Sequence, residues 1–117
     1  MDKHTHARVT TTYVSSVTDP VRFAVGETLT CGHRDQRWTS YVWCTDEAGR
    51  AGWVPDSYFS ETGPHEATAL RDYDATELTV ARGEHLEVLD EAGGWLLCRS
   101  AAGMVGWVPS DHVEPAG

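Results

Sequence analysis

The sequence predicts an all-β fold made of two small units in tandem, and two observations support this prediction. The tetrapeptide Gly-Trp-Val-Pro occurs at residues 52–55 and again at 106–109, an offset of 54 residues, while a Gly-Glu pair at 26–27 returns at 83–84, an offset of 57. The runs between these motifs are short, rich in Val, Thr, Trp and Leu, and interrupted by Gly, Asp or Pro, which is typical of strands joined by turns. A repeat of about 55 residues is close to the smallest chain that folds alone. We therefore expect two domains.

The second copy, expected at residues 66–114, is interpreted as five short antiparallel strands that curl into a small barrel. Alternation of apolar and polar residues predicts a strand at 85–90, with Leu86 and Val88 facing inward. The segment 110–112 predicts one turn of 3-10 helix. The remaining elements are expected at residues 66–72, 78–80, 95–100, 104–109 and 113–114.

The first copy, expected at residues 7–60, follows the same plan with a longer loop to Pro20 and a longer polar loop before Tyr41. Between the copies, residues 60–64 form a linker of about five residues stiffened by Pro64, so we expect the two barrels to touch or to hold few orientations. Its elements are expected at residues 9–13, 21–23, 28–31, 41–45 and 50–55, with a short helical turn at 56–58.

Apolar residues at the inward positions form the expected cores. Cys31, Cys44 and Cys98 lie in apolar runs without the spacing of a metal site, so we expect buried thiols that act as small hydrophobic side chains. Cys31 and Cys44 fall on neighbouring predicted strands, which leaves a disulfide under oxidising conditions open. The expected cores contain Leu70, Leu78, Leu86, Val88, Cys98, Val108 and Val113 in the second copy, and Val21, Leu29, Cys31, Cys44, Val54 and Phe59 in the first.

The net charge of −9 is unevenly divided along the sequence. Residues 1–60 carry six positive and seven negative side chains, hence −1, whereas residues 61–117 carry three and eleven, hence −8. Such a field repels phosphate backbones, so we expect no nucleic-acid partner and favour a partner with Arg or Lys. Acidity that only maintains solubility explains the charge equally well.

The sequence predicts neither a membrane span nor an export signal. No stretch approaches the roughly 20 apolar residues of a membrane-spanning helix, and residues 1–6 lack the apolar segment of a signal peptide. We therefore expect a cytoplasmic protein without a membrane partner.

The second copy contains four motifs in a fixed order: Ala69-Leu70-Arg71-Asp72-Tyr73, Glu77-Leu78-Thr79-Val80 with Gly83-Glu84, Trp95-Leu96, and Gly106-Trp107-Val108-Pro109-Ser110-Asp111-His112. Because these motifs follow the order and the spacings of the SH3 family, the second copy resembles an SH3 domain over nearly all of residues 66–114. The first copy matches less fully, since its opening at residues 9–13 is not recognisable as the family's ALYDY box. The chain is similar to the variant SH3 domains found in tandem in bacterial proteins, which implies two adaptor-like, peptide-binding barrels.

The resemblance implies a shallow groove on the second copy. Parallel aromatic rings accept the ridges of a polyproline II segment, and a carboxylate beside them selects a basic residue of the ligand. Arg71 and His112 stand where the family has its first and last groove tyrosines. The other implied ligand-binding residues are Tyr73, Trp95 and Pro109, with Glu77 as the acid.

The first copy is implied to carry a more aromatic and less acidic groove. Tyr41 occupies the position of the family's key Trp by spacing, and Trp38 offers an alternative ring from the longer loop. Because so small a barrel has little room inside, we expect the groove aromatics to lie at the surface. The other implied residues are Tyr13, Pro55 and Tyr58.

The chemistry of an enzyme is not indicated. The six histidines are scattered, and no nucleophile lies in a pattern with a base, so we expect a non-catalytic protein without metal or cofactor. The leading hypothesis is a module that binds extended, Pro-rich and/or Arg- or Lys-containing segments of another protein. Two alternatives stay open: a scaffold whose grooves mediate a homodimer or hold a fixed subunit, and recognition of cell-wall peptide.

Overall fold

The computed structural model describes residues 5–116, which form strands and only two three-residue 3-10 turns. Residues 1–4, part of the segment considered above for an export signal, and residue 117 lie outside the described part. The strands form two five-stranded antiparallel sheets and one two-stranded sheet. No helix among the described residues has the length and apolar character needed to cross a membrane. The all-β prediction is confirmed.

The chain divides into two units that do not follow sequence order. The described part of unit 1 comprises residues 5–17 and 76–116, and unit 2 comprises residues 18–75. Residues 5–17 therefore group with the second copy, and residues 66–75 group with the first. This division differs from the contiguous domains expected at residues 7–60 and 66–114, and a tandem arrangement is not confirmed.

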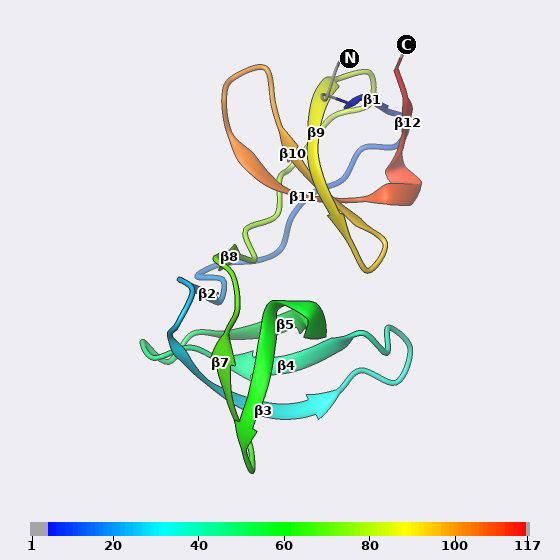
Figure 1. Ribbon diagram of the computed structural model, residues 1–117. Helices are drawn as coiled ribbons and strands as arrows, with labels where there is room; N and C mark the ends of the chain where they lie inside the picture. The colour runs from blue at the N-terminus through cyan, green and yellow to red at the C-terminus, as the bar shows by residue number, and fades with distance from the viewer. Residues whose placement is uncertain (1–4, 117) are drawn as a thin grey trace. The chain divides into compact units, whose positions relative to one another are not determined.

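Unit 1 contains one five-stranded sheet in the order β11-β10-β9-β1-β12. Figure 1 shows the blue β1 between the yellow β9 and the red β12, so strands from both ends of the chain share this sheet. Ala7 of β1 pairs with Leu86 of β9, and Val9 pairs with Val113 of β12. The elements are β1 (Thr5–Val9), β9 (His85–Ala92), β10 (Trp95–Arg99), β11 (Val105–Pro109), the 3-10 turn η2 (Ser110–His112) and β12 (Val113–Pro115).

Unit 2 repeats the same plan in the order β5-β4-β3-β7-β6. Here β7, from the second copy, lies between β3 and β6 of the first copy, just as β1 lies between β9 and β12. The two copies have thus exchanged their first strands, and we call this the strand exchange. The elements are β2 (Arg22–Phe23), β3 (Thr28–Arg34), β4 (Tyr41–Thr45), β5 (Ala51–Pro55), the 3-10 turn η1 (Asp56–Tyr58), β6 (Phe59–Gly63), β7 (Glu66–Ala69) and β8 (Tyr73–Asp74), which pairs with β2.

A two-residue turn explains why β7 belongs to unit 2. Gly63 pairs with Glu66, so only Pro64 and His65 separate β6 from β7. Proline at the second position of the turn and a positive φ of 59° at His65 in the third are features of a type II turn. Antiparallel strands joined by so short a turn pair with each other. The segment expected to act as a linker is therefore a β-hairpin, and β7 must add to the sheet that contains β6.

The cores largely match the prediction. The core of unit 1 contains Leu78, Leu86, Cys98 and Val108 together with Val9, which the strand exchange supplies. In unit 2 the six residues expected for the first copy are all buried. Val88 and Val113 are half-buried and pack against the unit 1 core.

The prediction that Leu70 belongs to a core is wrong, because 56% of this residue is exposed. Ala69, the last residue of β7, turns its side chain inward and is buried. Successive side chains of an extended chain point to opposite faces, so Leu70 points outward.

Candidate functional site

In unit 1, Tyr13 of the first copy lies among residues of the second copy. Its ring packs edge-on against Trp95, with ring centres 5.9 Å apart, and against His112, with ring centres 5.5 Å apart. Its hydroxyl donates a hydrogen bond to Oε1 of Glu77 at 2.5 Å. We call Tyr13, Glu77, Trp95 and His112 the unit 1 cluster.

The backbone holds the members of the unit 1 cluster in place. Tyr13 and Val80 exchange two backbone hydrogen bonds of 2.9 and 2.8 Å in an antiparallel bridge. Trp95 begins β10 opposite Pro109 of β11, and His112 ends η2. The cluster therefore draws on four separate segments of the chain, and strand pairing sets the position of its tyrosine.

The unit 1 cluster is partly open to solvent. All four members, and Pro109 beside them, are half-buried. Burial raises the pKa of the Tyr13 hydroxyl well above its usual value, and the hydrogen bond to Glu77 and its negative charge raise it further. The hydroxyl therefore stays protonated and remains a donor. Nδ1 of His112 lies 2.8 Å from a carboxylate oxygen of Asp111, so the imidazole is oriented as well.

Unit 2 brings together a second set of predicted residues from both copies. The rings of Tyr58 and Tyr73 lie 4.9 Å apart, and the Arg71 guanidinium stacks over the Tyr58 ring at 4.2 Å. Phe23 packs on Tyr73 at 5.6 Å, and the Tyr73 hydroxyl donates to the carbonyl oxygen of Trp53 at 3.1 Å. Arg71 and Tyr73 thus lie with Tyr58 rather than with Trp95, so the structure groups the predicted residues differently from the copy-by-copy grooves.

Most of the predicted groove residues of unit 2 are buried. Tyr58 is 3% exposed and Tyr73 is 8% exposed, and Tyr41 and Pro55, which pair across β4 and β5, are buried as well. Burial and the neighbouring Tyr58 raise the pKa of Tyr41 to about 12. The expectation that these aromatics lie at the surface is wrong. The reason is that Arg71 covers the Tyr58 ring, and that Tyr58 and Tyr73 also pack against each other.

Trp38 differs from these residues because half of it is exposed. It lies in the loop between β3 and β4, where the backbone N–H groups of Arg37 and Trp38 donate to Asp35. These two hydrogen bonds lower the pKa of the Asp35 carboxyl. The two hydrogen bonds to Asp35 thus organise the loop locally.

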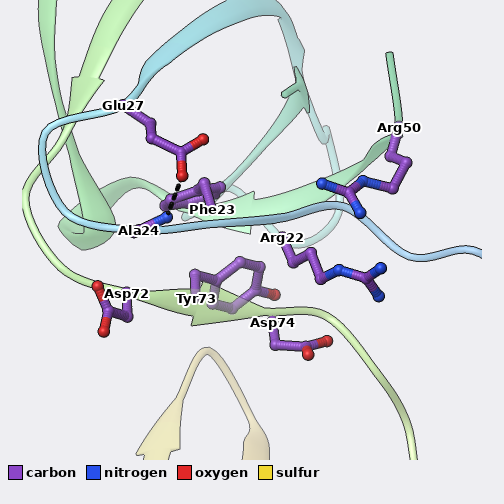
Figure 2. A pocket seen from close by; sticks show the side chains of 8 residues that line it. All are labelled: Arg22, Phe23, Ala24, Glu27, Arg50, Asp72, Tyr73 and Asp74. Atoms are coloured by element: carbon purple, nitrogen blue, oxygen red, sulfur yellow. Dashed lines mark hydrogen bonds between the residues drawn. The ribbon is translucent and has the colours of Figure 1, made fainter. Parts of the chain in front are cut away.

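An open pocket of about 470 Å³ lies beside β2 and β8 of unit 2, and the sequence did not indicate it. Figure 2 shows the rings of Phe23 and Tyr73 on the same side of the pocket, with the dashed hydrogen bond from the Ala24 N–H to Glu27 beside Phe23. Arg22 and Asp74 are register partners that the strand exchange brings together from different copies. The full lining is Arg22, Phe23, Ala24, Glu27, Arg50, Asp72, Tyr73 and Asp74.

A second aromatic group, outside the predicted ligand-binding residues, lies on β3, β4 and β5. Trp43 and Trp53 are register partners with ring centres 5.1 Å apart, and His33 packs edge-on against Trp53 at 5.3 Å. Trp43 is exposed because it alternates with the buried Val42 and Cys44. The alternation of side chains along this strand is the feature of the sequence from which the outward position of Trp43 could have been predicted.

The strand exchange also changes the distribution of charge. The described residues of unit 1 carry three Arg and seven Asp or Glu, hence −4, and unit 2 carries five Arg and ten Asp or Glu, hence −5. The net charges of the two folded units are therefore similar, although those of the two sequence halves, −1 and −8, are not. Within residues 5–116, no group of three His, Cys, Asp or Glu side chains is arranged to hold a metal ion.

Residues 68–116 match the family described as the variant SH3 domain. Three curated relatives contain similar segments, and this chain spans less than a tenth of the length of each. It is 54% identical over 41 residues to epidermal growth factor receptor kinase substrate 8-like protein 3 of Mus musculus, covering 35% of this chain and 7% of the relative. The Homo sapiens protein of the same name is 51% identical over 39 residues, covering 33% and 7%. Tyrosine-protein kinase Abl of Drosophila melanogaster is 37% identical over 60 residues, covering 47% and 4%.

The matched segment begins in β7 of unit 2 and continues through β12 of unit 1, so it follows the sequence across the strand exchange. The all-β architecture is consistent with an SH3-like fold. One variant SH3 domain is thus found in the chain, at residues 68–116, and this match supports a protein–protein interaction module.

Proposed function

We propose that the chain is a non-catalytic interaction module whose unit 1 cluster binds an extended, Pro-rich and/or basic segment of another protein. The observation that carries the proposal is the meeting of Tyr13 with Trp95 and Glu77, which combines two rings and a carboxylate at one half-buried site. Rings packed edge-on leave faces available for the ridges of a polyproline II segment. A half-buried position suits binding, because the rings are held by packing yet remain reachable.

The charges around the cluster favour a ligand with Arg or Lys. Glu77 lies within the cluster, and the side chain of Asp111, next to His112, is 85% exposed. The net charge of −4 on the described residues of unit 1 adds a longer-range attraction, which speeds association with a basic segment. An arginine that lies over Trp95 or Tyr13 would also gain a cation–π contact.

In unit 2 we propose that Tyr58, Tyr73 and Pro55 serve packing rather than peptide binding. Their burial and the Arg71 guanidinium on the Tyr58 ring support this assignment, because a ligand would have to displace the guanidinium before it reached that ring. The functional site is accordingly assigned to unit 1 alone.

The test is a calorimetric titration with a Pro-rich peptide that contains arginine. We expect Trp95→Ala to weaken binding by about 30-fold, since truncation of a central interface aromatic costs about 2 kcal/mol. Trp38→Ala is the matched control: it removes an exposed tryptophan from unit 2 and should change the affinity by less than about twofold. Unchanged binding in Trp95→Ala, or loss of binding in Trp38→Ala, would contradict the assignment to unit 1.

A further inference from the structure

We propose that Cys31 and Cys44 form a reversible disulfide when the folded protein meets a peroxide, so that unit 2 carries a redox-sensitive clasp between β3 and β4. The two residues are direct register partners on these strands. Their sulfur atoms lie 3.9 Å apart, and both residues are buried. The inference does not depend on the peptide-binding role of unit 1.

The hydrogen-bond pattern of β3 places the two thiols at the closer kind of cross-strand pair. The backbone N–H of Cys31 donates to the carbonyl oxygen of His65 at 2.8 Å, so it points toward β7 and away from β4. Cys31 and Cys44 therefore form a non-hydrogen-bonded pair, the type in which facing side chains approach most closely. The sulfurs need to close from 3.9 Å to about 2.05 Å, and both partners already face each other.

Unit 1 provides an internal comparison. Cys98 of β10 corresponds to Cys44 of β4, but its register partner on β9 is Val88. A valine thus occupies the position in the sheet of unit 1 that Cys31 occupies in unit 2. The corresponding position of unit 1 therefore does not require a thiol, and only unit 2 carries a cysteine pair.

The surroundings indicate which thiol reacts first. Cys31 lies beside a register irregularity of β3 and is 6% exposed, whereas Cys44 is fully buried. Burial raises the pKa of both thiols, so little thiolate is present at neutral pH and the reaction depends on local opening near the irregularity. Cys31 is the entry point, and Cys44 is the resolving thiol.

The chemistry balances with hydrogen peroxide as the oxidant. The Cys31 thiolate attacks one peroxide oxygen, the O–O bond breaks, and a sulfenic acid and hydroxide form. The Cys44 thiolate then attacks the Cys31 sulfur, which forms the S–S bond and expels the second hydroxide. The two thiol protons convert both hydroxides to water, so two thiols and one peroxide give one disulfide and two waters.

The disulfide would tether the base of the loop that carries Trp38, because its two cysteines are separated by 13 positions that include this loop. A cross-link of this span restricts the unfolded chain, so we expect Tm to rise by about 10 °C on oxidation and to return on reduction.

The test treats the folded protein with a small excess of hydrogen peroxide, followed by thiol blocking, mass spectrometry and thermal unfolding. We expect a mass loss of 2 Da, a linked peptide containing Cys31 and Cys44, one remaining blockable thiol, and reversal by dithiothreitol. Cys98→Ala should form the same disulfide. Cys31→Val, which copies the Val88 arrangement of unit 1, should form none and show no rise in Tm.

Three blockable thiols after peroxide treatment of the wild-type protein would overturn the proposal. So would a linked peptide that joins Cys98 to another cysteine, or an intermolecular disulfide. Because the peptide map of the wild-type protein decides the linkage, the proposal stays testable even if Cys31→Val fails to fold.

Discussion

Strand exchange makes a specific prediction about which residues can be cross-linked. Thr28 of β3 faces Thr68 of β7 in the register of unit 2. The neighbouring residues Glu27 and Ala69 form a hydrogen-bonded pair, since the Ala69 N–H donates to the carbonyl oxygen of Glu27 at 2.9 Å. Thr28 and Thr68 therefore form a non-hydrogen-bonded pair, the closer type of pair, and cysteines at both positions should join in a disulfide.

The same geometry names the matched control. Arg8 of β1 faces His85 of β9 in unit 1, and Thr28 occupies the position in unit 2 that corresponds to His85. If each copy kept its own first strand, Arg8 would face Thr28. The double variant Arg8→Cys with Thr28→Cys should accordingly remain unlinked in the exchanged fold.

The expected stabilisation follows from the span of the cross-link. A bridge between positions 28 and 68 closes a loop of about 40 residues, which corresponds to about 4 kcal/mol in the chain-entropy description. The assay is a peptide map without reductant, together with urea unfolding before and after reduction. A disulfide in Arg8→Cys with Thr28→Cys, together with free thiols in Thr28→Cys with Thr68→Cys, would refute the strand exchange.

Three further predictions concern the turn, a buried carboxylate and the charge of the unit 1 cluster. His65→Gly should raise the unfolding free energy by about 1 kcal/mol because glycine adopts the positive φ of this turn without strain, and an unchanged or lower urea midpoint would contradict this. Burial alone would raise the pKa of Asp46, but hydrogen bonds from the Arg22 N–H, the Arg50 side chain and other backbone N–H groups outweigh it and lower the pKa. Asp46→Ala should therefore lower the free energy of unfolding by about 3 kcal/mol at pH 7. The difference from wild type should shrink as the pH falls below about 4, because the carboxylate is then protonated first in the unfolded and then in the folded protein. A difference in urea unfolding that does not depend on pH would argue against this. Glu77→Gln keeps an acceptor for Tyr13 but removes the negative charge. Binding of an arginine-containing peptide should therefore weaken by about fivefold at low salt and by less at high salt. If the variant and the wild type bound the peptide with equal affinity at both salt concentrations, the charge would have no role.

Much of the local structure could be predicted from the sequence because it depends on neighbours along the chain. The alternating pattern at residues 85–90 predicts a strand, and β9 spans His85–Ala92. The predicted helical turns at residues 56–58 and 110–112 are confirmed as η1 and η2. The residue types that meet at the candidate site could also be named from the sequence, since Tyr13, Trp95 and Glu77 were all expected to bind ligand.

The partners of those residues could not be predicted from periodicity. The inward alanines Ala7 of β1 and Ala67 of β7 are both buried, and each fits beside the corresponding leucine, Leu86 or Leu29. Alternation reports which face of a strand is buried, but it does not report which of two similar sheets the strand joins. Grouping Tyr73 with Trp95, rather than Tyr13 with Trp95, followed from treating each copy as contiguous.

The amino-acid sequence by itself determined the β class, the repeated unit, the inward positions and the set of aromatic and acidic candidates. Tertiary structure alone decided which copy completes which sheet, and with it the unit 1 cluster, the closed tyrosines of unit 2 and the even division of charge. The physical reason is a matter of length: with only Pro64 and His65 between β6 and β7, the second copy's first strand pairs with β6. The vacant position beside β9 and β12 is then filled by β1.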